Sequence, residues 1–399
     1  MNFATFSSPA FFADPYPMYE KLREAGPLLP VGPNAVVTGR FEIIDALLRD
    51  RRMGKTYLQS VRARYGETAA EQPVFQALSR TFLMMNPPAH TKLRTLLMKA
   101  FNARQIEKQR EIVEATSRDL LDRVGAAAQF DLVSDYAMPL PVEIICRLLD
   151  VPSSHGTELS VAASRLVCAF DLAPLDDTAL AAANEAALTL ERYFRTVVEQ
   201  RRAKPGDDIV SSLANVEDDG ATLSDDEIIS NVKLLFIAGH ETTSNMIGNS
   251  MVALFRQPAQ LEALKREPAA ITRAVAECMR FDGSVQMVVR TALEKVVIHG
   301  VTLNPGTIVF MLTGAANRDP AMFAHPDQLD FERGANVPSL AFGGGIHYCL
   351  GARLALLELE VALRDLLARF PQMQPEDLDQ LDWHRRNNLR GVQSLRIRT

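Results

Sequence analysis

Apolar side chains recur every three to four positions along most of this chain, which predicts a mainly helical fold. The repeat is clearest over residues 106–124, 177–204 and 261–279. A longer repeat starts at Leu223 and meets no proline before Pro258. Ser224 followed by Glu227 is typical of a capping box at its start. A helix of this length extends over about 50 Å, so we expect it to cross a whole domain and lie buried in its core.

Strand patterns are few and short. Runs rich in β-branched residues cover residues 35–38, 295–299, 307–312 and 395–398. Asn304, Pro305 and Gly306 separate two such runs and predict a tight turn. The segment 57–79 is the least regular part, and no repeat or Gly/Ser linker divides the sequence. These patterns predict a single domain over residues 1–399, mainly α, with a long central helix and small peripheral β-sheets.

Composition narrows the class of protein. The chain has 399 residues and a net charge of −6, whereas a nucleic-acid binder normally carries a basic excess. No apolar run approaches the ~20 residues that span a bilayer, and residues 1–27 do not resemble a signal peptide. Four scattered cysteines fit a reducing compartment. We therefore expect a cytoplasmic protein with no membrane or nucleic-acid partner.

The segment "AFGGGIHYCLGARLA", residues 341–355, carries the most unusual pattern. Three glycines let the backbone come close to something large and flat, and the helix predicted to begin at Cys349 would lower the pKa of its thiol. Three interpretations follow from the residues alone. A phosphate loop lacks the Lys-Ser/Thr that should follow the glycines. A nucleophilic cysteine lacks an evident base nearby, and a structural buried thiol is what most cysteines are.

The stretch "FGGGIHYCLGARLA" closely resembles the haem-binding signature of the cytochromes P-450, in which phenylalanine, glycine-x-glycine, a basic residue and cysteine-x-glycine follow in this order. The resemblance implies the cytochrome P-450 fold and one haem b. It also implies that Cys349 is the proximal thiolate ligand of the iron and that Phe342 packs against the haem.

A second resemblance lies inside the long predicted helix. "AGHETT", residues 238–243, is similar to the oxygen-activation segment of the family. The resemblance implies that Glu241 and Thr242 form the acid–alcohol pair that delivers protons. Gly239 costs about 1 kcal/mol relative to alanine in a helix interior, so we expect a close approach there. Taken alone, Thr242 is better interpreted as bonding back to a carbonyl one turn earlier, as mid-helix threonines often do.

Two further segments match charged motifs of the family. Glu277 and Arg280 in "ECMR" face each other at i and i+3 and resemble its ExxR pair, with Arg333 in "LDFER" as the third member. We interpret these three residues as structural. "NPPAHTKLR" places His90 and Arg94 on one helix face, where they can bind a carboxylate.

The resemblance assigns the remaining site residues. It implies that His90 and Arg94 hold a haem propionate, together with Arg290 and His347. It also implies that the substrate pocket is lined by Leu235, Ala238, Gly239, Val285 and Met287.

Two positions depart from the family pattern. Gly283 and Ser284 stand where a proline usually follows the ExxR arginine, which weakens the assignment of Val285 and Met287. Asn86 stands where relatives often have aspartate.

Together these motifs identify the chain as a soluble bacterial-type monooxygenase, expected to be a monomer. It would insert one oxygen atom of O2 into a small organic substrate, by hydroxylation or epoxidation, in secondary-metabolite tailoring. Ferredoxin and ferredoxin reductase would supply the electrons. Two alternatives stay open: a peroxide-driven peroxygenase, although such relatives usually replace the acid–threonine pair, and a haem-thiolate sensor, which would need an output domain.

Overall fold

The computed structural model describes residues 3–100, 103–125, 127–171, 173–217, 220, 222–334 and 338–399. These residues group into two compact units, each built from separate segments of the chain. The first unit comprises Met1–Gly54, Val113–Leu140 and Thr242–Thr399; the second comprises Lys55–Ile112 and Pro141–Glu241. The prediction of a single domain over residues 1–399 stays a prediction.

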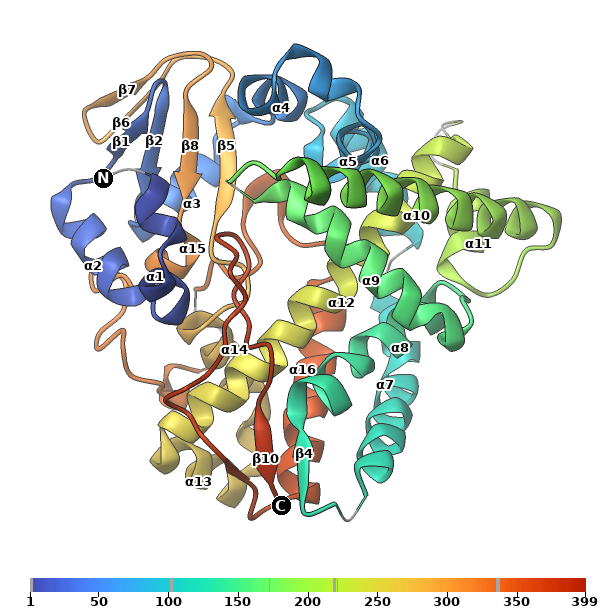
Figure 1. Ribbon diagram of the computed structural model, residues 1–399, viewed down its shortest axis with the longest axis vertical. Coiled ribbons are helices and arrows are strands. Elements are labelled where there is room, and N and C mark those ends of the chain that lie inside the picture. Colours follow the sequence, from blue (N-terminus) through green and yellow to red (C-terminus); the bar gives the residue numbers. More distant parts are fainter. Residues whose placement is uncertain are drawn as a thin grey trace. The chain divides into compact units, whose positions relative to one another are not determined.

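Helices make up most of both units (Figure 1). Those within the first unit are α1 (Pro9–Ala13), α2 (Tyr16–Ala25), α3 (Phe41–Arg49), α13 (Pro258–Arg266), α14 (Ile271–Phe281), α15 (Thr313–Ala316) and α16 (Ala352–Arg369). Those within the second are α4 (Tyr57–Tyr65), α5 (Pro73–Ser79), α6 (Ala89–Ala100), α9 (Gly156–Val167), α10 (Asp177–Ala203) and α11 (Ile209–Asn215). Residues of both units contribute to α7 (Ala103–Val124), α8 (Pro139–Leu148) and α12 (Asp225–Arg256).

The long helix predicted before Pro258 is α12, and its start is capped as expected. The Glu227 N–H donates to Ser224 Oγ at 3.3 Å, and the Ser224 N–H donates to Glu227 Oε2 at 2.8 Å. This reciprocal pair satisfies two backbone donors that a helix N-terminus leaves without partners. The helices predicted at 106–124 and 177–204 are confirmed as α7 and α10.

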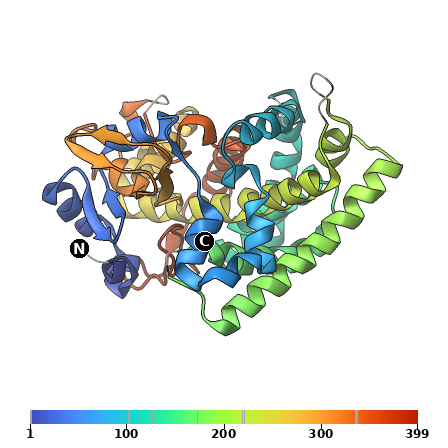
Figure 2. The same ribbon diagram turned by 90° about the horizontal axis from the view of Figure 1, so that it is seen from above.

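A five-stranded sheet in the first unit joins the early and late parts of the chain. Its order is β1 (Leu29–Gly32), β2 (Ala35–Thr38), β8 (Ile308–Met311), β5 (Val288–Ala292) and β3 (Met53–Gly54). β2 and β8 run parallel, with Ala35 opposite Ile308, and the other pairs are antiparallel. Figure 2 shows the N-terminal strands beside the later ones. Leu47, Leu303 and Val309 belong to the buried cluster around α3 and these strands.

Two smaller sheets complete the first unit. One has the order β4 (Gln129–Asp131), β10 (Arg396–Arg398), β9 (Gln374–Pro375), and the other pairs β6 (Val296–Ile298) with β7 (Val301–Leu303). The predicted turn between β7 and β8 is present, because the Thr307 N–H donates to Asn304 O at 2.9 Å and Gly306 has a φ of 87°. All four predicted strands are therefore confirmed, each within one or two residues.

Two predictions of local structure were wrong. Residues 261–279 form two helices, because Pro268 removes a backbone donor and forces Glu267 out of the helical region, to φ −126° and ψ 73°. The segment 57–79 is largely helical, as α4, a 3₁₀ turn and α5. Gly66, at φ 95°, ends α4, and Pro73 starts α5. The pattern of the segment 57–79 looked irregular because its helices are short and are interrupted by these residues.

Two features complete the description of the helices. α9 and α10 pack side by side in the second unit (Figure 1), where alanines on α10 allow a close approach. Among the described residues, no helix is both long enough and apolar enough to cross a membrane.

A buried ion pair fixes the end of α14, where the family usually has proline. Arg390 Nε lies 2.9 Å from Asp282 Oδ1, and both side chains are less than a tenth exposed. The Tyr16 hydroxyl donates to the same carboxylate oxygen at 2.5 Å, and burial together with Asp282 raises the pKa of that tyrosine. A side chain at Gly283 would come within 2.8 Å of the Met279 carbonyl oxygen, so this position has no room for proline.

We predict that Arg390→Met lowers the free energy of unfolding by about 3 kcal/mol, because it leaves Asp282 buried without its counter-charge. Urea unfolding of the whole protein, followed by far-UV circular dichroism, measures this. Arg364→Met is the control, since that arginine is 42% exposed and its ion pairs with Glu114 and Asp365 should contribute less than about 1 kcal/mol. Equal losses in the two variants would contradict the prediction.

Candidate active site

The loop before Cys349 is shaped by its own backbone. Three hydrogen bonds curl it: Gly343 N–H to Leu340 O at 2.9 Å, Tyr348 N–H to Gly345 O at 3.1 Å and Cys349 N–H to Phe342 O at 3.1 Å. Gly343 and Gly345 adopt φ values of 69° and 62°, a region that side chains disfavour. The Cys349 side chain ends this loop and is exposed in the structure.

The glycines also let the loop approach the end of α3 in the same unit. A Cβ on Gly345 would lie 1.8 Å from the Leu48 carbonyl oxygen, and one on Gly344 would lie 3.3 Å from the Leu48 side chain. The first distance is impossible for any other residue without moving the loop. At these two glycines the backbone comes close to α3, whereas the expected approach to something large and flat stays a prediction.

The helix predicted to begin at Cys349 begins three residues later, at Ala352. The Cys349 N–H is already used by Phe342, and Gly351 takes the capping position, where its carbonyl accepts the Ala355 N–H at 3.0 Å. Cys349 therefore precedes α16 and is not part of its first turn. The thiol still lies close in sequence to a helix N-terminus, where partial positive charge favours a thiolate.

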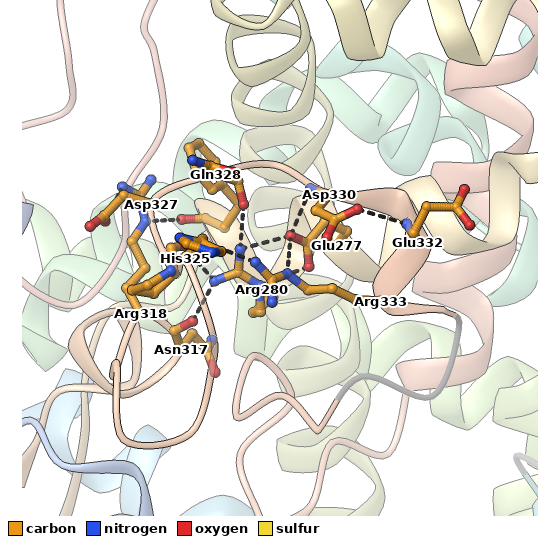
Figure 3. Close-up of polar contacts among 12 residues, drawn as sticks. Glu277, Arg280, Asn317, Arg318, His325, Asp327, Gln328, Asp330, Glu332 and Arg333 are labelled. Atoms are coloured by element: carbon orange, nitrogen blue, oxygen red, sulfur yellow. Dashed lines mark hydrogen bonds and ion pairs between the residues drawn. The ribbon is translucent and has the colours of Figure 1, made fainter.

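A buried ionic cluster in the first unit joins Glu277, Arg280 and Arg333 (Figure 3). Arg280 Nε and Nη2 donate to the two carboxylate oxygens of Glu277 at 2.7 Å each, and both side chains are fully buried. Arg333 Nε donates to Glu277 Oε1 at 3.1 Å. The three residues predicted to form the ExxR cluster are thus brought together.

The guanidinium of Arg280 also binds three backbone carbonyls. Nη1 donates to Asn317 O and Pro326 O at 2.8 Å each, and Nη2 donates to Gln328 O at 3.0 Å. With the two bonds to Glu277, all of its N–H donors are used, as full burial of a charged group requires. The segment after α15 is therefore held by a cation in the core.

Asn317 connects the Arg280 cluster to the cysteine loop. Its carbonyl accepts from Arg280, and its Oδ1 accepts the Leu340 N–H at 2.8 Å, at the residue where the loop begins. Asn317 is buried. We missed this residue in the sequence, although "ANRDP" carries it, because no local pattern indicates which backbone group a buried amide will bind.

Arg290, on β5, is a further buried arginine of the first unit. Its Nη1 donates to Val289 O at 3.0 Å, and burial lowers its pKa to about 10. No acidic side chain in the described part of the chain offsets this effect. A buried cation with a backbone carbonyl as acceptor suits an anionic group such as a haem propionate.

The other predicted residues of this unit lie as follows. The Phe342 and Tyr348 rings are 6.1 Å apart, with Phe342 half-buried. His347 is half-buried in the short 3₁₀ turn Gly345–His347. Val285 is half-buried and Met287 is buried. Thr313 Oγ1 donates to Val285 O at 2.9 Å, so the backbone at Val285 is fixed.

His90 and Arg94 lie one helical turn apart on α6, in the second unit. His90 is buried and Arg94 is half-buried. The Phe82 ring contacts both: its centroid is 6.2 Å from the His90 ring and 5.9 Å from the Arg94 guanidinium carbon. Asn231, on α12, holds Phe82 by accepting its N–H at 3.0 Å. The two residues predicted to bind one carboxylate therefore share one hydrophobic support.

The stretch 238–242 of α12 differs from the rest of that helix. Leu235, Phe236 and His240 are buried, whereas Ala238 is exposed and Gly239, Glu241 and Thr242 are partly exposed. His240 Nδ1 lies 2.8 Å from the Phe236 carbonyl oxygen, and burial lowers the pKa of this histidine. A Cβ on Gly239 would lie 3.3 Å from Ile145 of α8, which gives this glycine a packing role.

We predict that Asn317→Ala loosens the cysteine loop and leaves Arg280 in place. The variant removes the acceptor of the buried Leu340 N–H and keeps the carbonyl that binds Arg280, so the free energy of unfolding should fall by about 1–3 kcal/mol. Hydrogen exchange at the Leu340 and Gly343 amides should accelerate at least about tenfold. Asn215→Ala, which removes a bond within α11, is the control. Unchanged exchange at Leu340 would contradict this role of Asn317.

Comparison with known proteins finds a family model and relatives that match this chain. The Cytochrome P450 family model matches residues 153–388. Over 395 residues the chain is 49% identical to the putative cytochrome P450 133B2 of Xylella fastidiosa (strain Temecula1), covering 99% of each protein. It is 35% identical to the 6-deoxyerythronolide B hydroxylase of Saccharopolyspora erythraea, covering 98% of this chain and 97% of that protein.

Among solved structures, P450BioI in complex with hexadec-9Z-enoic acid ligated acyl carrier protein matches with a TM-score of 0.92. Its sequence is 33% identical, and the match covers 98% of this chain and 100% of that one. The predicted fold and family are thus confirmed. This chain belongs to the cytochrome P450 family and is a monooxygenase with haem b as its cofactor.

Proposed function

We propose that this monooxygenase hydroxylates or epoxidises a small organic substrate in secondary-metabolite tailoring, with electrons from ferredoxin and ferredoxin reductase. The observation that carries the proposal is the position of Cys349 at the end of a loop that the buried Arg280 cluster holds through Asn317. A ligand fixed in this way needs little reorganisation when it binds iron.

Haem b supplies the redox chemistry of oxygen activation when it is bound. Cys349 would hold the haem iron through its thiolate, and Phe342, whose carbonyl accepts the Cys349 N–H, would pack against the haem. Arg290 and His347 bind propionate in this proposal, and so do His90 and Arg94. Support comes from the buried Arg290, whose cation is not balanced by an acid in the described residues, and from the shared contact of His90 and Arg94 with Phe82.

Proton delivery is assigned to Glu241 and Thr242 on α12. Both side chains are partly exposed, so water can reach them, and a carboxyl group next to a hydroxyl can pass a proton on. His240 is buried, with Nδ1 2.8 Å from the Phe236 carbonyl oxygen, which makes it a poor member of the relay.

The substrate pocket stays a proposal at Leu235, Ala238, Gly239, Val285 and Met287. The exposure of Ala238 supports its assignment to the pocket. The side of Gly239 where a Cβ would stand faces Ile145, so that side packs against α8. The secondary-metabolite role is supported by the similarity to 6-deoxyerythronolide B hydroxylase. P450BioI was solved with an acyl carrier protein, which raises the question of a carrier-bound substrate for this chain too.

The thiolate assignment is tested by the carbon monoxide complex of the reduced protein. We expect the Soret band at the position typical of haem-thiolate proteins, and we expect Cys349→Ala to lose it because no thiolate then faces the iron. Cys168→Ala is the control, since that cysteine lies in the other unit. A thiolate-type band that survives in Cys349→Ala would refute the assignment.

The electron source separates the three functions considered. Substrates are first selected by the blue shift of the ferric Soret band that they cause. With ferredoxin, ferredoxin reductase and NADPH, we expect turnover, and we expect Thr242→Ala to reduce product formation roughly 100-fold while oxygen consumption continues. Turnover that hydrogen peroxide supports better than ferredoxin would indicate a peroxygenase. The absence of turnover with either would favour a sensor.

A further inference from the structure

Asn86 makes a reciprocal pair of hydrogen bonds with the backbone of Lys55, in the second unit. The Lys55 N–H donates to Asn86 Oδ1 at 2.8 Å, and Asn86 Nδ2 donates to Lys55 O at 2.8 Å. A carboxamide can make both bonds because it carries one acceptor and two donors. The side chain of Asn86 therefore ties together two segments that are distant in the sequence.

The backbone of Asn86 sits at the start of α6. Its carbonyl accepts the His90 N–H at 3.0 Å, and the Pro88 carbonyl accepts the Lys92 N–H at 3.1 Å. The first turn of α6 thus begins from a residue whose own side chain is fixed on Lys55. A shift of Asn86 would be passed directly to the first turn, which carries His90, and along the helix to Arg94.

The chemistry of the pair requires an amide at this position. An aspartate can accept the Lys55 N–H, but its ionised carboxylate has no donor for the Lys55 carbonyl and would face that oxygen with a negative charge. Both bonds to Lys55 therefore depend on a side chain that donates as well as accepts.

We propose that Asn86 is a positioning residue for the haem: it sets where α6 begins and so holds His90 and Arg94 at the propionate. This inference rests on the proposed propionate role of those two residues. Its ligand is the carboxylate of the haem, and its effect is on retention of the cofactor, which can be measured without substrate or turnover.

The test compares Asn86→Asp and Asn86→Ala in the haem-loaded protein. The first readout is the rate at which haem passes to an excess of apomyoglobin, and we expect both variants to lose haem about tenfold faster than the unsubstituted protein, as for other groups that orient metal ligands. The second readout is hydrogen exchange. In Asn86→Asp the carboxylate still accepts the Lys55 N–H, so the Lys55 amide should stay protected from exchange. In Asn86→Ala this acceptor is missing, so the protection should be lost.

Asn184→Asp is the matched control. Asn184 likewise uses its Oδ1 to accept a backbone N–H, from Val74 at 3.0 Å, and its Nδ2 to donate to Gln72, but it lies on α10. This variant loses the same kind of donor in the same unit and should keep its haem at the normal rate. Faster haem loss in Asn184→Asp would show a general effect of the substitution and would overturn the inference.

Two further variants distinguish failure of the inference from failure of the propionate assignment. Arg94→Ala should accelerate haem loss, and Asn86→Asp combined with Arg94→Ala should be no faster than Arg94→Ala alone if Asn86 acts through Arg94. Normal haem loss in Asn86→Asp, with fast loss in Arg94→Ala, would overturn the role of Asn86 only. Normal loss in Arg94→Ala would refute the propionate assignment and the inference together.

Discussion

The irregular segments of the first unit depend on one desolvated cation above all, the guanidinium of Arg280. A charge that is removed from water must have its donors paired, and this one uses two bonds to Glu277 and three to backbone carbonyls. Because those carbonyls belong to a segment with little regular secondary structure, the cation fixes a backbone path that helices and strands would not fix. Asn317 lies on that path and accepts the Leu340 N–H, so the position where the cysteine loop begins is fixed as well.

Two buried arginines of this unit show how the same side chain can serve different purposes. Arg280 is balanced by a carboxylate within the protein and contributes to the fold. The positive charge of Arg290 is balanced by no acid among the described residues, and burial lowers its pKa. An unbalanced buried cation is unfavourable unless a ligand supplies the anion. In its proposed role at a propionate, Arg290 would favour binding of the acidic cofactor and lower the stability of the protein without it.

The sequence predicted the features that neighbouring residues determine, and it did not predict those that depend on contacts between segments far apart along the chain. α10, α12 and the β2 strand follow from local periodicity and capping, and they lie within a few residues of the predicted positions. Pro268 was visible in the sequence, but the helical repeat around it hid the break. Gly345 and Leu48 could not be paired in advance, because two segments distant along the chain determine their contact. For the same reason, the motif indicated Cys349 but not Asn317.

The cysteine loop keeps its shape through bonds between backbone groups, and the side chain of Ile346 is 42% exposed. The exposed side chain of Ile346 therefore takes no part in the backbone hydrogen bonds that hold the loop in its conformation. With Cys349 as the proposed iron ligand, position 346 offers a nearby place where a fluorescent label or an electrode linker can be attached without changing the backbone bonds that shape the loop.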